Sequence, residues 1–490
     1  MEKTFLAFDL GASSGRAIIG KISDEKVEIS EIHRFPNGPL EKDGALYWDI
    51  EKLFYELKTG LRKALKTVSN ISGVGIDTWG VDYAIVKPNG KLARNPYHYR
   101  DKRTEGAEKK VYELISPDEL YRKTGIQFMI LNTIFQLYVH KQMHPEDMDG
   151  TVLMMPDALS YLFTGKVSCE YTNASTTGIL NAIKKNWDQD IITKLSLPKT
   201  LFPNISQPCS SAGNLSCEIR KELDCENIPF FHVGSHDTAS AVAAVPSIGN
   251  EHFAYISCGT WALLGTEIDK PLLNEESQRA NYTNEGGLNG KIRFLTNITG
   301  LWLLQECKRI WDSEGKKYSY SQMVEMGEKA EPLKYLINPS NNIFLSPCNM
   351  PDLIKKYCYE SGQGMIKDDH SIIRCVLDSL GMCFRVKILE LEKICRTKFE
   401  KIHIIGGGCQ NRLLMQNAAD LMEKEVIAGP VEATAIGNII AQGMASGIIS
   451  SLQQGRKIIS QSFPLDTFKP SHNISRDFLK NKEDFFRKLK

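Results

Sequence analysis

The amino-acid sequence predicts an α/β fold built from two halves of similar design. Strand-like and helix-like apolar patterns mix in each half: residues 50–66 repeat leucine at helical spacing, whereas residues 72–76 form a short apolar run typical of a strand. A glycine- and serine-rich hairpin opens the first half, and a second hairpin of the same kind appears about half a chain later. Two α/β halves of related design are therefore expected.

Length and charge narrow the class of ligand. The chain has 490 residues, about three times the ~150 residues of a typical domain, which predicts two or three folded units. Its 60 Lys and Arg residues against 59 Asp and Glu residues supply no global field for nucleic acid or an anionic membrane. No apolar run approaches the ~18–20 residues that span a bilayer. We expect a cytoplasmic protein with small-molecule ligands and no nucleic-acid or membrane partner; monomer and dimer both stay open.

The twelve cysteines are predicted to be buried, reduced thiols. They are scattered singly between Cys169 and Cys409, without a C-x-x-C pair or a Cys/His cluster of zinc-finger spacing. Neither a disulfide framework nor a structural zinc site is expected.

Two hairpins frame the predicted domains. The first pairs strands at 4–8 and 17–20, and the second pairs strands at 253–257 and 262–265. Residues 246–250, just before the second hairpin, have the composition of a linker. We therefore predict an N-terminal domain over 1–246, a C-terminal domain over 247–450, and a peripheral helix with a solvated tail over 451–490.

The turn of the first hairpin, Asp9–Arg16, combines glycines, two serines and an arginine. Glycines let backbone N–H groups point into one concavity, and the hydroxyls and the arginine add donors and positive charge, which suits a polyphosphate. Asp9, at the strand end, is placed to face a magnesium ion through water. The alternative is an ordinary tight hairpin whose Arg16 forms a surface ion pair.

Two later segments have related chemistry. Ser257–Trp261 puts small residues and hydroxyls at the second hairpin bend, where they would hold the other side of the same phosphate chain; taken alone, it is only a turn. Gly406–Asn411 lies between a predicted strand at 401–405 and a predicted helix at 411–424. Its glycines would let a flat ring or a ribose phosphate approach the backbone closely, and the alternative is strand-to-helix packing.

The segment Gly234–Val242 allows two interpretations. In the structural one, Ser235, Asp237 or Thr238 caps a buried helix. In the functional one, Asp237 accepts a proton from a substrate hydroxyl as a phosphoryl group is transferred, where the placement of the carboxylate matters more than its basicity. His236 is expected to donate a hydrogen bond to substrate or to serve as a structural partner, because no second metal ligand lies at a useful spacing.

Further polar segments complete the candidate site. Gly73–Tyr83 is a predicted strand that runs into a bend with two carboxylates, a hydroxyl and aromatic rings, a mixture that suits a polyhydroxylated ligand; the alternative is a strand end with Trp79 in the core. Asn297–Gln305 is predicted to lie at a helix start, and a structural role is favoured locally. Tyr97–Arg103 interleaves aromatic and basic residues, and a solvated loop or a substrate lid is expected there.

Together these segments resemble the FGGY family of carbohydrate kinases. The segments that carry the resemblance stand in order and with family-like spacing: Asp9–Arg16, Gly75–Tyr83, Gly234–Thr238, Ser257–Trp261, Asn284–Gly287, Asn297–Gln305 and Gly406–Asn411. The match runs through roughly residues 4–445. The resemblance implies two actin/hexokinase-like (ribonuclease-H-like) ATPase domains that close on Mg-ATP and a ketose in an interdomain cleft.

The resemblance also implies an activity and a set of site residues. The implied reaction is the ATP-dependent phosphorylation of L-rhamnulose on its 1-hydroxyl, with L-fuculose, xylulose or another deoxyketose as the alternative acceptor. Asp237 is the implied base. The implied ATP contacts are Ala12, Ser13, Ser14, Gly15, Arg16, Thr260, Gln305 and Gly407. The implied sugar contacts are Gly80, His236, Asp237, Thr238 and Asn297.

Two other classes of function remain open. A non-enzymatic ATP-driven switch on the same architecture would need neither the carboxylate at Asp237 nor the polar cluster at 77–83. A dinucleotide-dependent oxidoreductase would use Gly406–Gly408, but the G-x-G-x-x-G spacing fails there, at Asn411. A Walker-type nucleotide site is disfavoured because no Gly-Lys pair is followed by Ser or Thr.

Overall fold

The computed structural model describes residues 2–23, 25–249 and 252–489, and the chain divides into two compact units. Unit 1 comprises Met1–Gly249, Glu267–Phe294 and Ala433–Ser462, and unit 2 comprises Asn250–Thr266, Leu295–Glu432 and Phe463–Lys490. Each unit therefore joins segments far apart in the sequence. The predicted boundary after residue 246 stays a prediction, and Asn250 of the proposed linker lies outside the described residues.

Unit 1 contains a six-stranded mixed sheet. Its strands adjoin in the order β13 (Ser210–Asn214), β14 (Pro229–His232), β6 (Gly73–Thr78), β1 (Lys3–Leu10), β2 (Ser14–Ile22) and β3 (Val27–Pro36). The hairpin β1–β2 is antiparallel, as predicted, whereas β1, β6 and β14 run parallel. The carboxyl ends of the three parallel strands therefore meet at one edge of the sheet.

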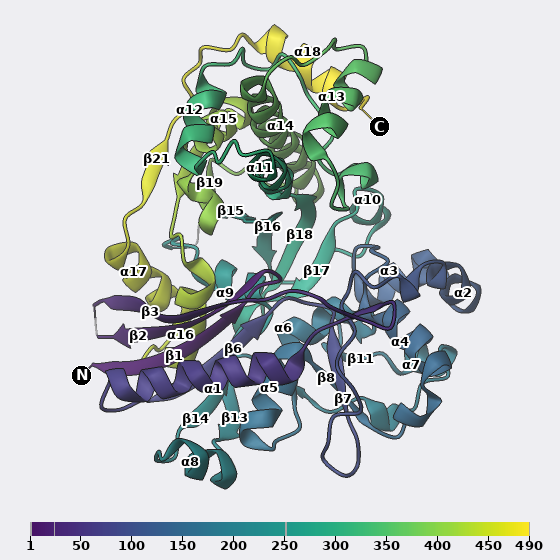
Figure 1. Ribbon diagram of the computed structural model, residues 1–490, viewed down its shortest axis with the longest axis vertical. Helices are drawn as coiled ribbons and strands as arrows, with labels where there is room; N and C mark the ends of the chain where they lie inside the picture. Colours follow the sequence, from purple (N-terminus) through teal and green to yellow (C-terminus); the bar gives the residue numbers. More distant parts are fainter. Residues whose placement is uncertain (1, 24, 250–251, 490) are drawn as a thin grey trace. The chain divides into compact units, whose positions relative to one another are not determined.

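Helix α1 (Ile50–Thr67) covers one face of this sheet (Figure 1). The Asp49 side chain caps the helix by accepting a hydrogen bond from the Lys52 N–H. Leucines at 53, 57 and 61 are buried in a core that also contains Leu6 and Phe8 of β1. The predicted helix over 50–66 is confirmed, because its apolar positions form a single stripe.

Helix α16 (Ala433–Ala445) covers the opposite face. Gly20 lies across from Phe5 in the β1–β2 register, and so on the other face from Leu6. A Cβ at Gly20 would lie 2.3 Å from the Ile439 side chain of α16. The late segment 433–462 is thus part of the layer that supports β1.

The remaining elements of unit 1 surround this core. The other strands are β4 (Leu40–Lys42), β5 (Ala45–Tyr47), β7 (Tyr83–Val86), β8 (Thr151–Met154), β9 (Cys169–Glu170), β10 (Leu180–Asn181), β11 (Asn186–Trp187), β12 (Ile205–Ser206) and β17 (Thr283–Gly286). The other helices are α2 (Ala107–Leu114), α3 (Pro117–Thr124), α4 (Thr133–Met143), α5 (Met155–Thr164), α6 (Tyr171–Ala174), α7 (Gln189–Lys194), α8 (Cys217–Leu223), α9 (Asp237–Ala243), α10 (Glu275–Arg279) and α17 (Leu452–Ser462).

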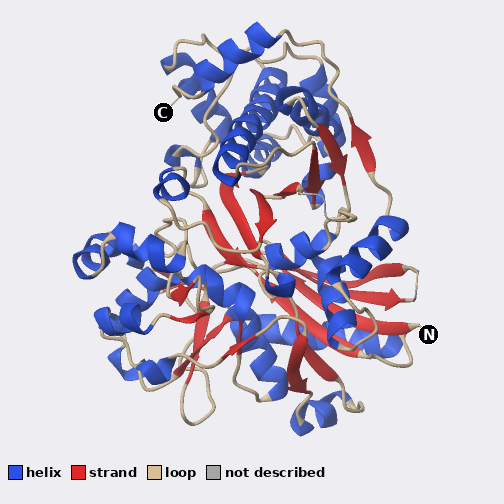
Figure 2. Ribbon diagram, turned by 180° about the vertical axis from the view of Figure 1, so that it is seen from behind, coloured by secondary structure: helices blue, strands red, loops and turns tan. Residues whose placement is uncertain are grey.

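Unit 2 is also a sheet flanked by helices (Figure 2). Its strands adjoin in the order β18 (Ile292–Thr299), β16 (Trp261–Ile268), β15 (Ala254–Cys258), β19 (Lys401–Ile405), β20 (Glu425–Ala428) and β21 (Asp466–Phe468). Its helices are α11 (Trp302–Ser313), α12 (Tyr320–Glu328), α13 (Met350–Glu360), α14 (Asp369–Cys395), α15 (Arg412–Met422) and α18 (Arg476–Phe486). The predicted second hairpin, the strand at 401–405 and the helix after residue 411 are confirmed.

The segment after residue 451 forms the helices α17 and α18, which ion pairs hold in place, and most of the described residues after 470 are exposed. In unit 1, Arg456 of α17 is 3% exposed and forms an ion pair with Glu267 at 2.8 Å. In unit 2, Glu483 of α18 accepts a hydrogen bond from Arg385 of α14 at 2.8 Å. The polar composition of this segment reflects specific ion pairs rather than contact with water alone.

Two sequence-based exclusions can be compared with the structure. All twelve cysteines lie in the described part of the chain and are free; seven are buried, four are half-buried and Cys217 is exposed, so the prediction of burial is correct only for the majority. Among the described residues, no helix combines the length and apolar content that crossing a bilayer requires.

Helix α16 also positions α9, the helix that begins at Asp237. A Cβ at Gly437 of α16 would lie 1.8 Å from the backbone oxygen of Ser240 in α9, so only glycine allows this approach. Farther along α16, a Cβ at Gly443 would meet side-chain atoms rather than backbone: Ile22 at 2.8 Å and Ile449 at 2.9 Å. The α9–α16 contact therefore depends on one glycine.

Asp82 ties together the turn that follows β6. Its carboxylate accepts hydrogen bonds from the indole N–H groups of Trp48 and Trp79 at 2.6 and 3.1 Å, from the Tyr99 backbone N–H and from the Gln136 amide. Burial nevertheless raises the pKa of Asp82 to about 6. We call these five residues the Asp82 cluster.

Substituting alanine for Gly437 should separate α16 from α9. Overpacking of this kind typically costs about 1–3 kcal/mol, so we expect G437A to lower the melting temperature by several degrees and to reduce activity. G443A is the matched control, because its added Cβ would meet the ends of the Ile22 and Ile449 side chains, which can move aside, and no backbone atom. Equal melting temperatures for the two variants would contradict the proposed role of Gly437.

The Asp82 cluster predicts a pH dependence of stability. Because the folded state holds the proton up to about pH 6 and the unfolded chain releases it near 3.8, the stability contribution of Asp82 falls as pH rises between these values. From pH 5 to pH 7 the wild type should lose about 1 kcal/mol more unfolding free energy than D82N. Urea titrations at both pH values measure this difference, and parallel changes in the two proteins would contradict the assignment.

Candidate active site

The first hairpin turn is braced from two directions. Asp9 and Arg16 face each other across the hairpin, with 2.5 Å between the guanidinium and the carboxylate. The side-chain amide of Asn37, just after β3, donates to the Gly11 carbonyl at 2.8 Å, and its backbone N–H donates to the Ser13 carbonyl at 3.0 Å. Rather than forming the surface ion pair of the alternative interpretation, Arg16 is largely buried beside Asp9.

The space around the two glycines of this turn differs, so only one of them is required by packing. A Cβ at Gly15 would lie 2.2 Å from the Phe35 ring, so packing alone requires glycine there. At Gly11 the nearest atom would be 3.6 Å away, which any residue tolerates. Ser13 is exposed, and Ala12 and Ser14 are half-buried. The exposed part of the turn that is available to a ligand is therefore Ala12–Ser14.

Asp77 lies directly beside Asp9 in the parallel β1–β6 pair. The Asn438 amide donates to its Oδ2 at 2.6 Å, and no partner is found for its buried Oδ1 among the described residues. Burial first, and the nearby Asp9 charge second, raise its pKa well above the ordinary value. The sequence predicts that the carboxylates of this segment bond the hydroxyls of a ligand, whereas Asp77 is 0% exposed in the structure.

The bend after β6 is strained and tightly held. Val81 has a φ of 68°, in the left-handed region that β-branched residues strongly avoid. Its N–H donates to the Thr176 hydroxyl at 3.0 Å, and its carbonyl accepts from the Thr133 hydroxyl at 2.6 Å. The same Thr176 side chain would lie 3.1 Å from a Cβ at Gly80. The backbone of the predicted sugar contact Gly80 is thus fixed, and Trp79 is buried, as the structural alternative predicted.

The turn before Asp237 is bound to a buried carboxylate. Glu170 accepts hydrogen bonds from the Ser235 hydroxyl at 2.5 Å and from the Ser235 N–H at 3.3 Å. The Thr78 N–H at the end of β6 donates to the Ser235 carbonyl at 2.9 Å, and the His236 N–H donates to the Thr172 hydroxyl at 3.2 Å. Glu170 and Thr172 were missed by sequence reasoning, since they lie more than sixty residues before the turn.

These contacts overturn the helix-capping interpretation of 234–242. His236 is the N-cap residue of α9, and no side chain caps this helix. Asp237 is its first residue, and its side chain is 30% exposed. Thr238 donates its hydroxyl to Asp237 Oδ1 at 3.0 Å, and the Thr238 backbone N–H also bonds to this carboxylate.

The surroundings of Asp237 shift its acidity. Partial burial raises its pKa above the ordinary value, the neighbouring His236 opposes that shift, and the negative charge of Asp9 adds to it. The carboxyls of Asp9, Asp77 and Asp237 thus lie near enough to influence one another. Among the described residues, however, no group of three His, Cys, Asp or Glu side chains is arranged to hold a metal ion by itself.

His236 has two charged neighbours that sequence reasoning did not assign. Its Nδ1 lies 3.0 Å from Arg293 Nη2 and 3.2 Å from Glu285 Oε2, while its Nε2 faces Asp237 Oδ1 at 3.4 Å. Glu285 belongs to Asn284–Gly287, one of the segments that carry the family resemblance. The signal available in the sequence was the Asn284–Gly287 segment itself, which gives no indication of a contact with His236.

In unit 2 the structure brings three predicted segments around the second hairpin. The Thr260 hydroxyl donates to Gln305 Oε1 at 3.2 Å, and the Gly300 N–H donates to the Thr260 carbonyl at 3.1 Å. A Cβ at Gly408 would lie 2.4 Å from the Cys258 sulfur, so this glycine serves packing. Gly407, in contrast, is exposed with open space around it, which suits contact with a ligand.

The prediction that Asn297 and Gln305 share a helix start is wrong. Asn297 lies near the end of β18, and Gln305 lies in the first turns of α11 after a bend at Gly300 and Leu301. The alternating apolar positions of 292–299 are typical of a strand. Both residues belong to unit 2, whereas Gly80, His236, Asp237 and Thr238 belong to unit 1.

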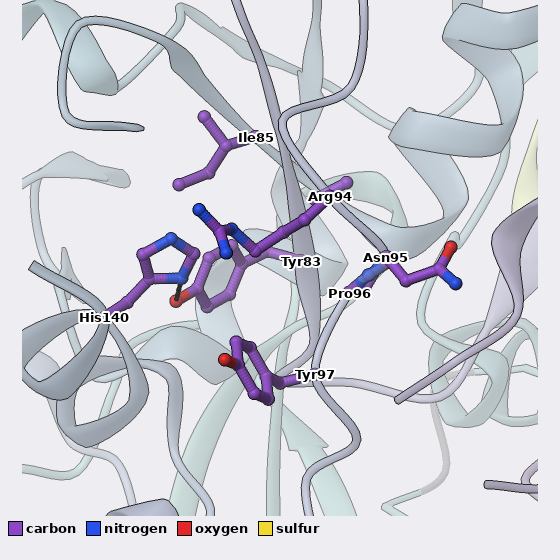
Figure 3. Close-up of a pocket in the computed structure, with 8 residues that line it drawn as sticks. Tyr83, Ile85, Arg94, Asn95, Pro96, Tyr97 and His140 are labelled. Carbon is purple, nitrogen blue, oxygen red and sulfur yellow. Dashed lines mark hydrogen bonds between the residues drawn. The ribbon is translucent and has the colours of Figure 1, made fainter. Parts of the chain in front are cut away.

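A small pocket lies beside β7. Tyr83, Ile85, Arg94, Asn95, Pro96, Tyr97 and His140 line it, and the Tyr83 hydroxyl contacts His140 Nδ1 at 3.1 Å (Figure 3). Burial lowers the pKa of His140 to about 4, although its Nε2 lies 3.1 Å from Asp147. Tyr83 and Tyr97 come from the predicted polar segment at 73–83 and the predicted loop or lid at 97–103, whereas the residues implied to contact ATP and sugar lie outside the lining of this pocket.

Comparison with known proteins places this geometry in a family. The model of the FGGY family of carbohydrate kinases, N-terminal domain, matches residues 4–244, and that of the C-terminal domain matches residues 254–446. A rhamnulokinase of Bacteroides thetaiotaomicron is 40% identical over 97% of this chain and 98% of its own length. One from Halalkalibacterium halodurans is 42% identical over 94% of this chain and 98% of its own length.

Solved structures agree on the fold. A xylulose kinase from Lactobacillus acidophilus superposes with a TM-score of 0.80 at 15% identity, covering 99% of this chain and 96% of its own. Plasmodium falciparum glycerol kinase with ADP gives a TM-score of 0.77 at 16% identity, covering 99% and 97%. The predicted two-domain α/β fold is confirmed, and the protein belongs to the FGGY family of carbohydrate kinases.

Proposed function

We propose that this ATP-dependent sugar kinase transfers the terminal phosphoryl group of ATP to the 1-hydroxyl of L-rhamnulose, as a step of rhamnose metabolism. The observation that carries the proposal is the 38–42% identity, over nearly the whole chain, to several proteins named rhamnulokinase. The solved relatives at 12–16% identity include xylulose, gluconate and glycerol kinases, and they support the fold alone.

Asp237 is the proposed base. Its Oδ1 accepts the Thr238 hydroxyl and faces His236 Nε2, which leaves Oδ2 for the proton of the sugar hydroxyl. The sugar oxygen then forms its bond to the γ-phosphorus as the bond to the departing ADP oxygen breaks. Because that hydroxyl loses its proton late, the rigid turn that places Asp237 contributes more than the basicity of the carboxylate.

The remaining assignments follow the two units. We propose that Ala12–Arg16 in unit 1 and Thr260, Gln305 and Gly407 in unit 2 bind ATP. Gly80, His236 and Thr238 in unit 1 and Asn297 in unit 2 are the proposed sugar contacts. The twelve free thiols support a reducing compartment, and we propose the cytoplasm.

Asp9 is the proposed partner of magnesium, which it holds through water. Two neighbouring carboxylates, Asp77 and Asp237, have raised pKa values to which the charge of Asp9 contributes. A cation near Asp9 would therefore reduce the electrostatic repulsion among these three carboxylates. When bound, magnesium would neutralise the charge that develops on the phosphate oxygens. Arg16, paired with Asp9 in this structure, would add a second positive charge.

Replacing Asp237 with asparagine should abolish phosphorylation and leave ATP binding intact. Removing the proton acceptor lowers kcat by about 100-fold or more, while the hairpin turns are unchanged. ADP release with Mg-ATP and L-rhamnulose, beside L-fuculose and xylulose, measures turnover, and calorimetry measures ATP binding. D312N, which alters a half-exposed carboxylate on α11, is the control. Near-normal turnover by D237N would remove Asp237 from this role, and preference for another ketose would overturn the substrate.

The raised pKa of Asp237 predicts how kcat/KM decreases at low pH. Because its pKa is raised and the ionised form is required, kcat/KM should fall as pH falls through a value above the ordinary 3.8. The Thr238 hydrogen bond lowers this pKa, so T238V should move the acid limb to higher pH. An unmoved limb in T238V would show that another group titrates.

A further inference from the structure

Arg293 is a fully buried arginine beside the proposed base. Its side chain is 0% exposed, and its Nε donates to the Gly286 carbonyl at 2.7 Å. Its Nη2 lies 3.0 Å from His236 Nδ1 and 3.1 Å from Glu285 Oε2. The guanidinium therefore contacts the backbone, a counter-ion and an imidazole at once.

Arg293 and its neighbour Glu285 carry opposite charges. A guanidinium remains protonated in proteins, and the Arg293 charge lowers the pKa of Glu285 despite the burial of that carboxyl, so both are ionised. Arg293 and Glu285 thus form a buried ion pair. Glu285 neutralises Arg293, and the pair adds no net charge beside Asp237.

The hydrogen bond between Arg293 and Nδ1 determines which ring nitrogen of His236 carries the proton. A guanidinium only donates hydrogen bonds, so an N–H on Nδ1 would place two donors 3.0 Å apart. Nδ1 must therefore accept, and the ring carries its proton on Nε2. Glu285 Oε2, at 3.2 Å from Nδ1, would favour the opposite tautomer, but it does not remove the donor of Arg293.

The rest of the His236 environment is compatible with this tautomer. Nε2 faces Asp237 Oδ1 at 3.4 Å, where an N–H can donate to the carboxylate. The His236 backbone N–H donates to the Thr172 hydroxyl, and this bond fixes the backbone position from which the side chain extends. The charged groups recorded within 4 Å of the ring are therefore Asp237 on its own helix, Glu285 on β17 and Arg293 on β18.

We propose that Arg293, with Glu285 as its counter-ion, is a positioning residue that locks His236 in the Nε2–H tautomer. So locked, His236 donates from Nε2 to Asp237 or to an oxygen of the acceptor, and it cannot take the proton of the reacting hydroxyl. That proton passes to Asp237 alone. The consequence for turnover rests on the proposed function, whereas the tautomer itself is a property of the free enzyme.

The direct test is the ¹⁵N spectrum of the histidine imidazoles in the full-length protein without substrate. Comparison with H236Q identifies the signals of His236. We expect a pyridine-type Nδ1 and a pyrrole-type Nε2 in the wild type. An N–H on Nδ1 would overturn the proposal without reference to any variant or to the identity of the sugar.

Two variants separate the lock from simple packing. In E285Q/R293Q both charges are removed, and the glutamine at 293 can either donate or accept, so we expect mixed His236 tautomers. E285Q alone is the matched control, because Arg293 still donates to Nδ1 and the Nε2–H form should persist. An unchanged wild-type tautomer in the double variant would show that Arg293 does not select it.

Turnover gives the second measurement. With the ketose that the wild type prefers, the double variant should lose at least about tenfold in kcat while the KM for ATP stays within about twofold. Unchanged kcat despite mixed tautomers would overturn the role in catalysis. If no ketose supports turnover by the wild type, the proposed function fails, and the spectrum still decides the tautomer.

Discussion

The arrangement of the unit 1 site depends on one buried carboxylate, Glu170. It is 0% exposed and accepts hydrogen bonds from the N–H groups of Thr172, Asn173 and Ser235 and from the hydroxyls of Thr172 and Ser235. Burial raises its pKa, so an unsatisfied carboxylate here would be costly. The bonds from Thr172 and Asn173 fix Glu170 at the start of α6, and the two bonds from Ser235 then constrain the turn before α9 and with it the placement of Asp237.

The other contacts around this turn point the same way. The Asn173 amide donates to the carbonyls of both Trp79 and Ser235, which joins the bend after β6 to the turn before α9. Gly437 lets α16 approach the other side of α9. A base that acts mainly through its placement needs a scaffold of this kind, because a displacement of about 1 Å is enough to cost about 100-fold in rate.

Local patterns were sufficient for much of the fold. Both hairpins, α1 and the strand at 401–405 were predictable because their apolar periodicity lies within a few residues. The helix-capping interpretation failed because the turn at Ser235 is held by Glu170, sixty-five residues earlier. Asn297 was misplaced because an alternating strand followed by a glycine bend resembles a helix start in composition.

Long-range ion pairs account for what sequence reasoning missed. Arg293 and Glu285 lie on adjacent strands and reach His236 only in the folded chain. Arg456 and Glu483 belong to the polar segment after residue 451. Each forms a specific ion pair within its own unit. A charged residue has the same sequence signature whether it faces water or a buried partner, so no local pattern distinguishes the two cases.

The most direct test of the account is the kcat of E170Q, which keeps the shape of the side chain but replaces one accepting oxygen with a donor. D378N, at a buried carboxylate of unit 2 that accepts from the Leu333 N–H and from Asn417, is the matched control. We expect E170Q to lose about 100-fold in kcat with its fold intact by circular dichroism, and D378N to keep most of its kcat. A folded E170Q with wild-type kcat would contradict the claim that this carboxylate sets the position of Asp237.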